Sequence, residues 1–319
     1  MGEVTTISNT DHDGIYHQLY QHPLMLEDLV RQFVTEPWVA DLDFSRMEPV
    51  KTKYQVPEMP KRESDMVWRI PLRSGGAIYL LLLLEFQSKV ERWMVLRIII
   101  YLCLLWLELL YEKQIPAGGP LPPVFPAVLY NGDTPWLMPI RLRELIGLPD
   151  DSPLWPFQPD GQFFLIDEGR YKKDDLDQRD SLSALVFKIE QCQDPEDLPA
   201  LIDEVVAWFD RYPEFEELKT VLAHMFQNAI AAMTGDKVDD AKASLGLLEA
   251  KSMLQTNMER WRNEKQREWS RDGEIKGERQ GGANFLLRLL RRRFPTLPSW
   301  VEQKVLDANL DALAEWTDR

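Results

Sequence analysis

The chain has 319 residues, a formal net charge of −15, 45% hydrophobic residues and 28% charged residues. This length allows about two domains, and the apolar content excludes a chain that is disordered over most of its length. The acidic total argues against a protein that coats nucleic acid, although it leaves room for an enzyme with a local basic patch. The two cysteines, Cys103 and Cys192, exclude a disulfide scaffold or a zinc site and favour a reducing, cytoplasmic compartment.

The N-terminal residues lack a basic patch followed by an apolar stretch, so we expect no signal peptide. The most apolar segment covers residues 98–107, between Arg97 and Glu108. A helix that spans a membrane needs about 20 apolar residues. We therefore expect this segment to form a buried core helix with Cys103 inside it, and we expect no membrane association.

The apolar periodicity predicts a mixed α/β layer in the first half of the chain. Pro23 should divide the first helix, and Gly75–Gly76 should form a turn between two strands. The second of these strands is apolar on both faces, so we expect it to be central and covered on both sides. In chain order, the predicted elements are a helix at 15–35, strands at 65–72 and 77–87, a helix at 90–112 that packs on the sheet, and strands at 124–132 and 161–169.

The second half of the chain is predicted to be mostly helical. Helical periodicity runs from Leu182 to about Trp269. A polar linker with glycines is expected at residues 273–282, followed by a helical hairpin that turns at residues 294–298. We therefore divide the chain into a core at 11–175, a helical extension at 181–270 and a small basic C-terminal domain at 281–319.

Two features of the second half concern partners. Leu247, Leu254 and Trp261 are seven residues apart, which permits a short coiled-coil contact and hence a homodimer. Residues 259–293 hold 11 Lys or Arg against 6 Asp or Glu, so their arginines could follow a DNA backbone. The alternative is a helix end whose arginines pair with nearby acids. The arginines concerned are Arg288, Arg291, Arg292 and Arg293.

The stretch "YLLLLLEFQSK", residues 79–89, combines a buried strand with polar side chains at its end. Glu85 and Gln87 share one face because strand side chains alternate. If the two strands pair as a hairpin, Asp65 lies at a similar height to Glu85. Two carboxylates and an amide at one sheet end are costly unless a cation or hydrogen bonds compensate them. Such oxygen ligands suit Mg²⁺, with Mn²⁺ as a substitute.

A metal ion held by Asp65 and Glu85 could polarise a phosphodiester and lower the pKa of a bound water. Gln87 would orient that water or a phosphate oxygen, although it cannot supply the positive charge of a lysine. The alternative is that Asp65 begins a strand and Glu85 ends one, with no further role. The spacing alone does not decide between these two interpretations.

Five stretches occur in the order known from one family and cover residues 11–170: "DHDGIYHQLYQHPLMLEDLV", "ESDMVWRIPL", "YLLLLLEFQS", "MVLRIIIYLCLLW" and "FPAVLYNGDTPW". On these residues the chain resembles the Rpn family of recombination-promoting nucleases and transposases, in the PD-(D/E)XK nuclease superfamily. Residues 281–319 resemble a C-terminal domain of uncharacterised function that often follows such nucleases.

The resemblance implies a restriction-endonuclease-like mixed sheet flanked by helices in αβββαβ order, with residues 47–54 as the first strand. It implies a metal-dependent DNA endonuclease that promotes recombination or transposition. Asp65 matches the metal-binding aspartate of the family. Glu85 and Gln87 match its (D/E)-x-K pair, with glutamine where lysine is usual. The metal ligands are thus retained, whereas the efficiency of water activation is put in doubt.

Several further residues allow two interpretations. Glu27 and Asp28 on the first helix could add an acidic group to the site, but a solvated helix surface is favoured. Glu63 could be an extra metal ligand. Arg97 could clamp a phosphate or pair with a carboxylate as part of the structure. Asp167 is expected at the surface.

Two other functions compete with a DNA endonuclease. A catalytically weak or inactive nuclease fold could serve as a DNA- or protein-interaction module, which the acidic total and Gln87 favour. An RNA-directed nuclease is the weaker alternative, because the sequence has no aromatic motif that reads RNA. We expect DNA as the partner and no small-molecule cofactor.

Overall fold

In the computed structural model of the chain, the described residues are 9–51, 66–85, 91–132, 134–194, 196–234, 246–247, 267, 271, 277–294 and 297–317. The chain divides into two compact units, Met1–Leu254 and Gln255–Arg319. Five residues named in the predictions lie outside the described residues: Glu63, Asp65, Gln87, Leu254 and Trp261.

The N-terminal unit is built on a mixed sheet with the order β1-β2-β3-β4-β5. The first three strands are antiparallel neighbours, and β4 and β5 continue the sheet in parallel with β3. The prediction of a mixed α/β layer is confirmed, and the order of elements through β4 is the expected αβββαβ. The strands are β1 (Glu48–Pro49), β2 (Met66–Pro71), β3 (Ala77–Glu85), β4 (Val124–Tyr130) and β5 (Phe164–Asp167).

The predicted hairpin joins β2 to β3. Its register runs from Pro71↔Ala77 at the turn to Met66↔Leu82. Gly75 and Gly76 have φ angles of 108° and 80°, a region that glycine enters without the steric cost of a Cβ atom. The two glycines therefore allow the tight reversal on which the position of β3 depends.

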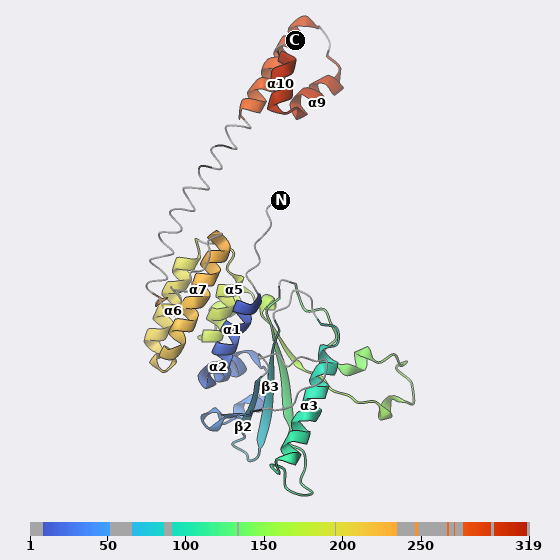
Figure 1. Cartoon of the computed structure of the whole chain (residues 1–319), viewed down its shortest axis with the longest axis vertical. Helices are drawn as coiled ribbons and strands as arrows, with labels where there is room; N and C mark the ends of the chain where they lie inside the picture. The colour runs from blue at the N-terminus through green and yellow to red at the C-terminus, as the bar shows by residue number, and fades with distance from the viewer. Residues whose placement is uncertain are drawn as a thin grey trace. The chain divides into compact units, whose positions relative to one another are not determined.

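Helices cover both faces of the sheet, with α3 (Met94–Tyr111) on one face and α1 (Asn9–Tyr20) and α2 (Pro23–Phe33) on the other (Figure 1). Alternate side chains of β3, including Leu81 and Leu83, share one hydrophobic cluster with residues of α3. Every β3 residue from Ile78 to Glu85 is buried. Burial on both faces explains why the strand has an unbroken apolar run.

The helix α3 forms where the sequence predicts it, but its burial differs from the prediction. Only the side that faces the sheet is covered, and Cys103 is exposed rather than buried. By length and composition α3 could cross a membrane, with a mean hydropathy of 2.1 over 18 residues, of which 44% are buried. The expectation of a fully buried core helix is therefore wrong, because no described element covers its outer side.

A group of helices follows the sheet and packs beside α1 and α2 (Figure 1). These helices are α4 (Lys173–Asp177), α5 (Leu182–Gln191), α6 (Leu198–Arg211) and α7 (Lys219–Thr234). Short 3-10 helices cover Pro37–Asp41, Phe44–Arg46, Leu142–Leu145, Trp155–Phe157, Glu168–Arg170 and Pro213–Leu218.

The C-terminal unit has a small core of its own. Residues 277–293 are helical, followed by α9 (Ser299–Asp307) and α10 (Leu310–Thr317). Leu286, Val305 and Leu313 meet at the centre of the three helices. Two predictions are wrong here: residues 277–282 are helix rather than linker, and the tail has three helices rather than a hairpin of two.

Asp28 connects α2 to the start of α5. Its Oδ2 atom accepts hydrogen bonds from Ser181 Oγ and from the Ser183 backbone N–H, each at 2.8 Å. Ser181 also accepts from the Ala184 N–H as the N-cap of α5. Asp28 is thus a structural cap between two helices and not the solvated residue that we expected.

Replacing Asp28 by Ala should destabilise the N-terminal unit by about 1–3 kcal/mol, because the Ser183 N–H loses its acceptor and α5 loses support for its cap. Glu27→Ala is the matched control, since Glu27 makes an exposed pair with Arg31 on the same helix and should cost under about 0.5 kcal/mol. Urea unfolding measures both. Equal losses in the two variants would contradict this account.

Candidate active site

Glu85 ends the central strand and is fully buried. It lies on the α3 face of the sheet, beside Tyr130 at the end of β4. The Arg97 guanidinium of α3 compensates its charge, with Nη2 at 3.6 Å from Glu85 Oε2. Arg97 Nη1 also donates to Glu91 Oε2 at 2.5 Å. Of the two roles considered for Arg97, the structure therefore shows the ion pair with carboxylates.

The ion pair does not use all the hydrogen-bonding capacity of Arg97. Its side chain is almost completely buried, yet Nε and Nη2 have no hydrogen-bond partner among the described residues. A buried donor without an acceptor costs about 1–3 kcal/mol, and such groups in native proteins often mark functional sites. Arg97 therefore has donors that no described residue accepts, and these could bind an oxyanion while the guanidinium balances Glu85.

The described residues supply one of the proposed metal ligands, Glu85. They contain no group of three or more His, Cys, Asp or Glu side chains that could hold a metal ion. Glu27 is engaged with Arg31 at 2.7 Å on the surface of α2. A metal ion at Glu85 would therefore need Asp65, which lies outside the described residues, as its second carboxylate.

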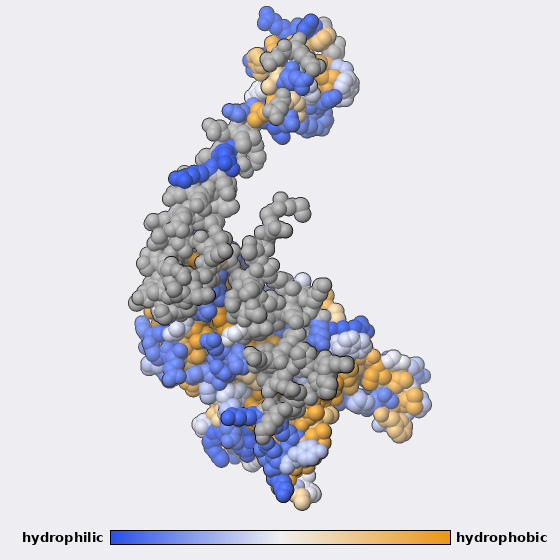
Figure 2. All heavy atoms as spheres, viewed as in Figure 1, coloured by the Kyte–Doolittle hydropathy of each residue, from blue (hydrophilic) through white to orange (hydrophobic). Residues whose placement is uncertain are grey.

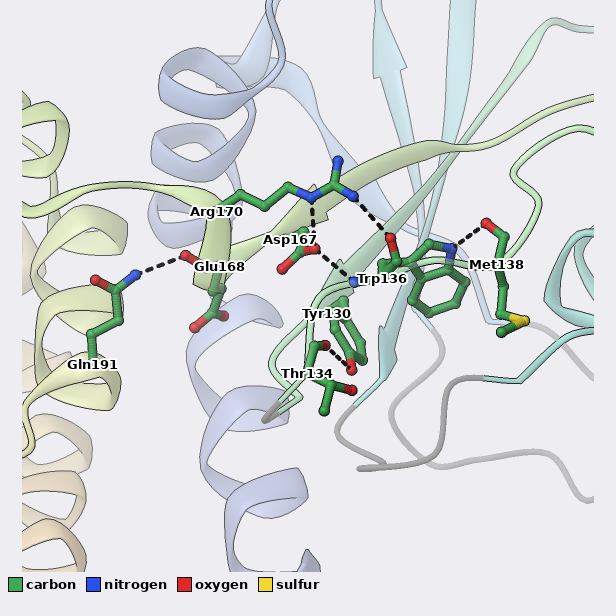
Figure 3. A network of polar contacts seen from close by, with 8 residues as sticks. All are labelled: Tyr130, Thr134, Trp136, Met138, Asp167, Glu168, Arg170 and Gln191. Atoms are coloured by element: carbon green, nitrogen blue, oxygen red, sulfur yellow. Dashed lines mark hydrogen bonds and ion pairs between the residues drawn. The ribbon is translucent and has the colours of Figure 1, made fainter.

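A polar network stabilises the loop after β4 against the end of β5 (Figure 3). Asp167 Oδ2 accepts from the Trp136 backbone N–H at 3.0 Å and pairs with Arg170 Nε at 3.0 Å. Arg170 in turn donates to the Trp136 carbonyl at 2.8 Å, and Tyr130 Oη donates to the Thr134 carbonyl at 2.7 Å. Asp167 is therefore buried and connects the loop after β4 to the end of β5. The expectation that it lies at the surface is wrong.

A second network lies on the opposite face of the same edge. Asn131 Nδ2 donates to Tyr16 Oη at 3.1 Å, and Tyr16 Oη donates to Glu168 Oε2 at 2.9 Å. The Asn131 backbone N–H donates to the Glu85 carbonyl at 3.1 Å. On the other side, Gln191 Nε2 donates to the Glu168 carbonyl at 2.7 Å (Figure 3). Hydrogen bonds thus connect the end of β3 to α5.

Glu168 is the most strongly perturbed carboxyl of this network. Burial raises its pKa well above the ordinary value, the nearby charge of Glu190 raises it further, and the hydrogen bond from Tyr16 opposes the shift in part. Asp167 adds a smaller repulsion. A protonated Glu168 therefore suits this site better than a carboxylate.

The sequence interpretation missed Tyr16, Asn131 and Glu168. Asn131 and Glu168 each come directly after a parallel strand, and the carboxyl ends of parallel strands meet at one edge of a sheet. That rule could have selected both residues. No local signal selects Tyr16, because its partners are more than 100 residues away in the sequence.

The arginines of the C-terminal unit fall into two classes. Arg291 pairs with Glu302, with Nη2 at 2.7 Å from Oε1. Arg288, Arg292 and Arg293 are exposed, and within the described part of the chain they have no ion pair. Pairing with a nearby acid is thus confirmed for Arg291, whereas DNA contact by the other three arginines stays a prediction.

The perturbed carboxyl predicts a pH-dependent stability. Because folding raises the pKa of Glu168, the folded protein holds this proton more tightly than the unfolded chain does. Its stabilising effect is complete below the ordinary value of 4.5 and is lost as the pH rises through the raised pKa. Glu168→Gln, which cannot ionise, should gain about 2–5 °C in melting temperature over the wild type as the pH rises to about 8.

Melting curves over this pH range, followed by near-ultraviolet circular dichroism, measure the difference. Glu214→Gln is the control, because Glu214 is exposed and its replacement should shift the melting temperature equally at every pH. A constant difference between Glu168→Gln and wild type across the range would show that Glu168 does not titrate as described.

Comparison with known proteins identifies the family of the chain. A family model described as "Putative transposase, YhgA-like" matches residues 10–220, which include the whole sheet, Glu85 and both networks at its edge. Neither a curated protein nor a solved structure matched the chain. Because the match covers more than half of the sequence, the chain belongs to the YhgA-like family that this description names.

Proposed function

We propose that the protein is a metal-dependent DNA endonuclease that hydrolyses phosphodiester bonds and thereby promotes recombination or transposition. The observation that carries the proposal is the pair Glu85 and Arg97. A fully buried carboxylate ends the central strand, and the guanidinium beside it keeps two buried donors without a hydrogen-bond partner among the described residues. The transposase family supports chemistry on DNA.

In this proposal Glu85 and Asp65 would hold a divalent ion, Mg²⁺ or Mn²⁺, which when bound supplies Lewis-acid polarisation of the phosphate. Arg97 would donate through Nε and Nη2 to a phosphate oxygen, as arginine does in bidentate phosphate recognition. Gln87 would orient the attacking water. Glu63, which is close to Asp65 in the sequence, is a candidate for an additional ligand.

One observation favours a second function, an interaction module that retains the nuclease fold. Arg97 already balances the charge of Glu85 at 3.6 Å, so the strand end is electrostatically compensated without a metal ion. Gln87, where the resembling family usually has lysine, also favours this second function. The two functions differ in whether divalent ions bind and DNA is cut.

The endonuclease proposal predicts that the protein nicks supercoiled plasmid in Mg²⁺ or Mn²⁺ and that EDTA abolishes nicking. Asp65→Asn and Glu85→Gln should each lower the rate about 100-fold or more, because each removes a metal ligand. Glu48→Gln is the control, since Glu48 is an exposed carboxylate on β1 that pairs with Arg69. Gel separation of nicked and closed plasmid gives the rates.

Thermal melts of each variant show whether a lower nicking rate reflects loss of the metal ligand or unfolding of the protein. Only a variant that melts like the wild type tests the role of its residue in catalysis. Nicking that persists in a folded Asp65→Asn and a folded Glu85→Gln would overturn the site assignment. Absence of both nicking and calorimetric Mn²⁺ binding in the wild type would instead favour the interaction module.

We also propose that the C-terminal unit contacts the DNA backbone through Arg288, Arg292 and Arg293. These side chains are exposed on a helix that has its own small core. In a chain with a net charge of −15, a basic unit would offset the repulsion that the acidic remainder exerts on phosphate. Binding of this kind releases counterions and weakens with salt.

Arg292→Ala should therefore lower the slope of log affinity against log salt concentration by about 1, the value for one lost phosphate contact. Arg291→Ala is the matched control, because the adjacent arginine is paired with Glu302 and should leave the slope unchanged. Fluorescence anisotropy with a labelled duplex measures both slopes. An unchanged slope in the triple variant of Arg288, Arg292 and Arg293 would rule out this contact.

A further inference from the structure

The outer side of α3 carries a regular apolar stripe that the described residues of the chain leave uncovered. Its residues are separated alternately by three and four positions, and we call this set the α3 seam: Trp93, Leu96, Ile100, Cys103, Leu107 and Leu110. Four of them, Trp93, Leu96, Leu107 and Leu110, are between 38% and 52% exposed. This 3-4 spacing is the one that packs two helices side by side.

The positions that flank the α3 seam are occupied by the chain itself. A Cβ atom at Gly161 would lie 2.3 Å from Ile99 Cδ1, so the loop before β5 packs closely on one flank. Trp106 Nε1 donates to the Pro122 carbonyl at 2.9 Å on the same helix side. Leu104 is half-buried on the other flank. The part of α3 that remains exposed is therefore a stripe about as wide as the contact between two packed helices.

The uncovered area has the size of a functional surface patch. The seam side chains together leave on the order of 500 Å² of apolar surface in water, and the largest patch on a monomer, about 300–600 Å², often has a function. Figure 2 shows hydrophobic residues along α3 and on the neighbouring loop. Tyr111, which follows Leu110 at the end of α3, is 85% exposed and extends this surface. A standard interface buries roughly 800 Å² on each partner.

We propose that the α3 seam binds the α3 seam of a second copy of this chain, with the two helices antiparallel about a two-fold axis. The seam positions are symmetric about the helix midpoint, between Tyr101 and Leu102. An antiparallel pair therefore places Trp93 on the partner's Leu110, Leu96 on the partner's Leu107 and Ile100 on the partner's Cys103. Each layer joins two apolar side chains, and no layer places the two tryptophans or the two cysteines on each other.

A parallel pair is less suitable, because it would place Trp93 on its own copy at one end and Cys103 on its own copy in the middle. The layer of two tryptophans would then hold too much side-chain volume and the layer of two cysteines too little, and both defects destabilise a packed contact. Antiparallel packing avoids both. It also forms a closed two-fold interface, the commonest kind in soluble assemblies.

A lipid surface is the competing occupant, and three observations disfavour it. The inner side of α3 is packed on the sheet, so α3 cannot cross a bilayer in this fold. Helices that lie on membranes carry a polar face rich in Lys and Arg, whereas α3 contains a single Lys or Arg, Arg97, which is buried. The net charge of −15 also repels the protein from anionic headgroups.

The test uses the full chain in sedimentation-velocity experiments at micromolar concentrations. The wild type should sediment as a dimer. Leu107→Glu should raise the dissociation constant roughly 100-fold or more, because the two-fold axis places two unpaired carboxylates in the interface. Leu289→Glu is the control: Leu289 is 41% exposed and lies on the C-terminal unit, so its variant should remain a dimer.

A charge-swap experiment tests the orientation. Leu96→Glu and Leu107→Lys should each be monomeric alone and should form a mixed dimer when combined. In the antiparallel pair the mixed dimer joins Glu to Lys in one layer and retains Leu on Leu in the other. A parallel pair would bring neither charge opposite the other, so mixing would restore nothing.

Four outcomes would overturn the proposal: a monomeric wild type at high micromolar concentration, a dimer unaffected by Leu107→Glu, dissociation by Leu289→Glu as well, or two variants that stay monomeric when mixed. Flotation with vesicles of neutral and of anionic phospholipid provides the last arm. Wild-type binding that Leu107→Glu abolishes, with no dimer in solution, would assign the seam to lipid instead.

Discussion

The interaction on which the rest of this structure depends is the compensation of Glu85 by Arg97. A carboxylate without contact to water costs several kcal/mol unless an opposite charge accompanies it. The cation comes from α3, while the main chain of Glu85 is bonded to Asn131 after β4. The buried charge of Glu85 therefore stabilises the contact between the end of β3, the start of α3 and the end of β4, because separating them would leave the carboxylate without an opposite charge.

The two faces of the sheet edge have different electrostatic characters. The α3 face holds a carboxylate and a guanidinium whose Nε and Nη2 have no hydrogen-bond partner among the described residues, an arrangement suited to a charged ligand. The α1 face holds Tyr16, Asn131 and a carboxyl whose pKa is raised by burial, an arrangement that favours neutral groups. Because the parallel strands end at this edge, the charged pair and the neutral network lie close together but on opposite faces of the sheet.

Local periodicity predicted the parts of the fold that local physics determines. The hairpin at Gly75–Gly76 and the central position of β3 follow from turn chemistry and from an apolar run that requires cover on both faces. Asp167 and Cys103 were assigned wrongly because their burial depends on distant segments. Asp167 is buried where it accepts a hydrogen bond from the Trp136 backbone N–H, in the loop between β4 and β5. Cys103 is exposed, and the composition of a helix does not reveal which of its sides packs on another element.

The candidate site was predicted in part for the same reason. Glu85 could be selected because a charge at the end of a buried strand requires compensation, which is a local argument. That Arg97 lies beside Glu85 depends on the approach of α3, which no local pattern reveals. The predicted linker at residues 273–282 is wrong for residues 277–282, which are helical. They begin a helix that packs against Leu313 in the small C-terminal core, a contact that composition alone does not reveal.

The parallel pairing of β3 and β4 has a consequence for the order of synthesis. The hairpin covers one edge of β3 as soon as the strand is made, but the partner for the other edge ends forty-five residues later, at Tyr130. At ribosomal speeds of about 5–20 residues per second, that edge waits roughly 2–9 s. During this time the chain exposes the unpaired edge of a strand that is apolar from Ala77 to Leu84, and then an apolar helix. Because an exposed apolar edge favours aggregation, we expect the interval between the synthesis of Glu85 and Tyr130 to be the period when the nascent protein most needs a chaperone.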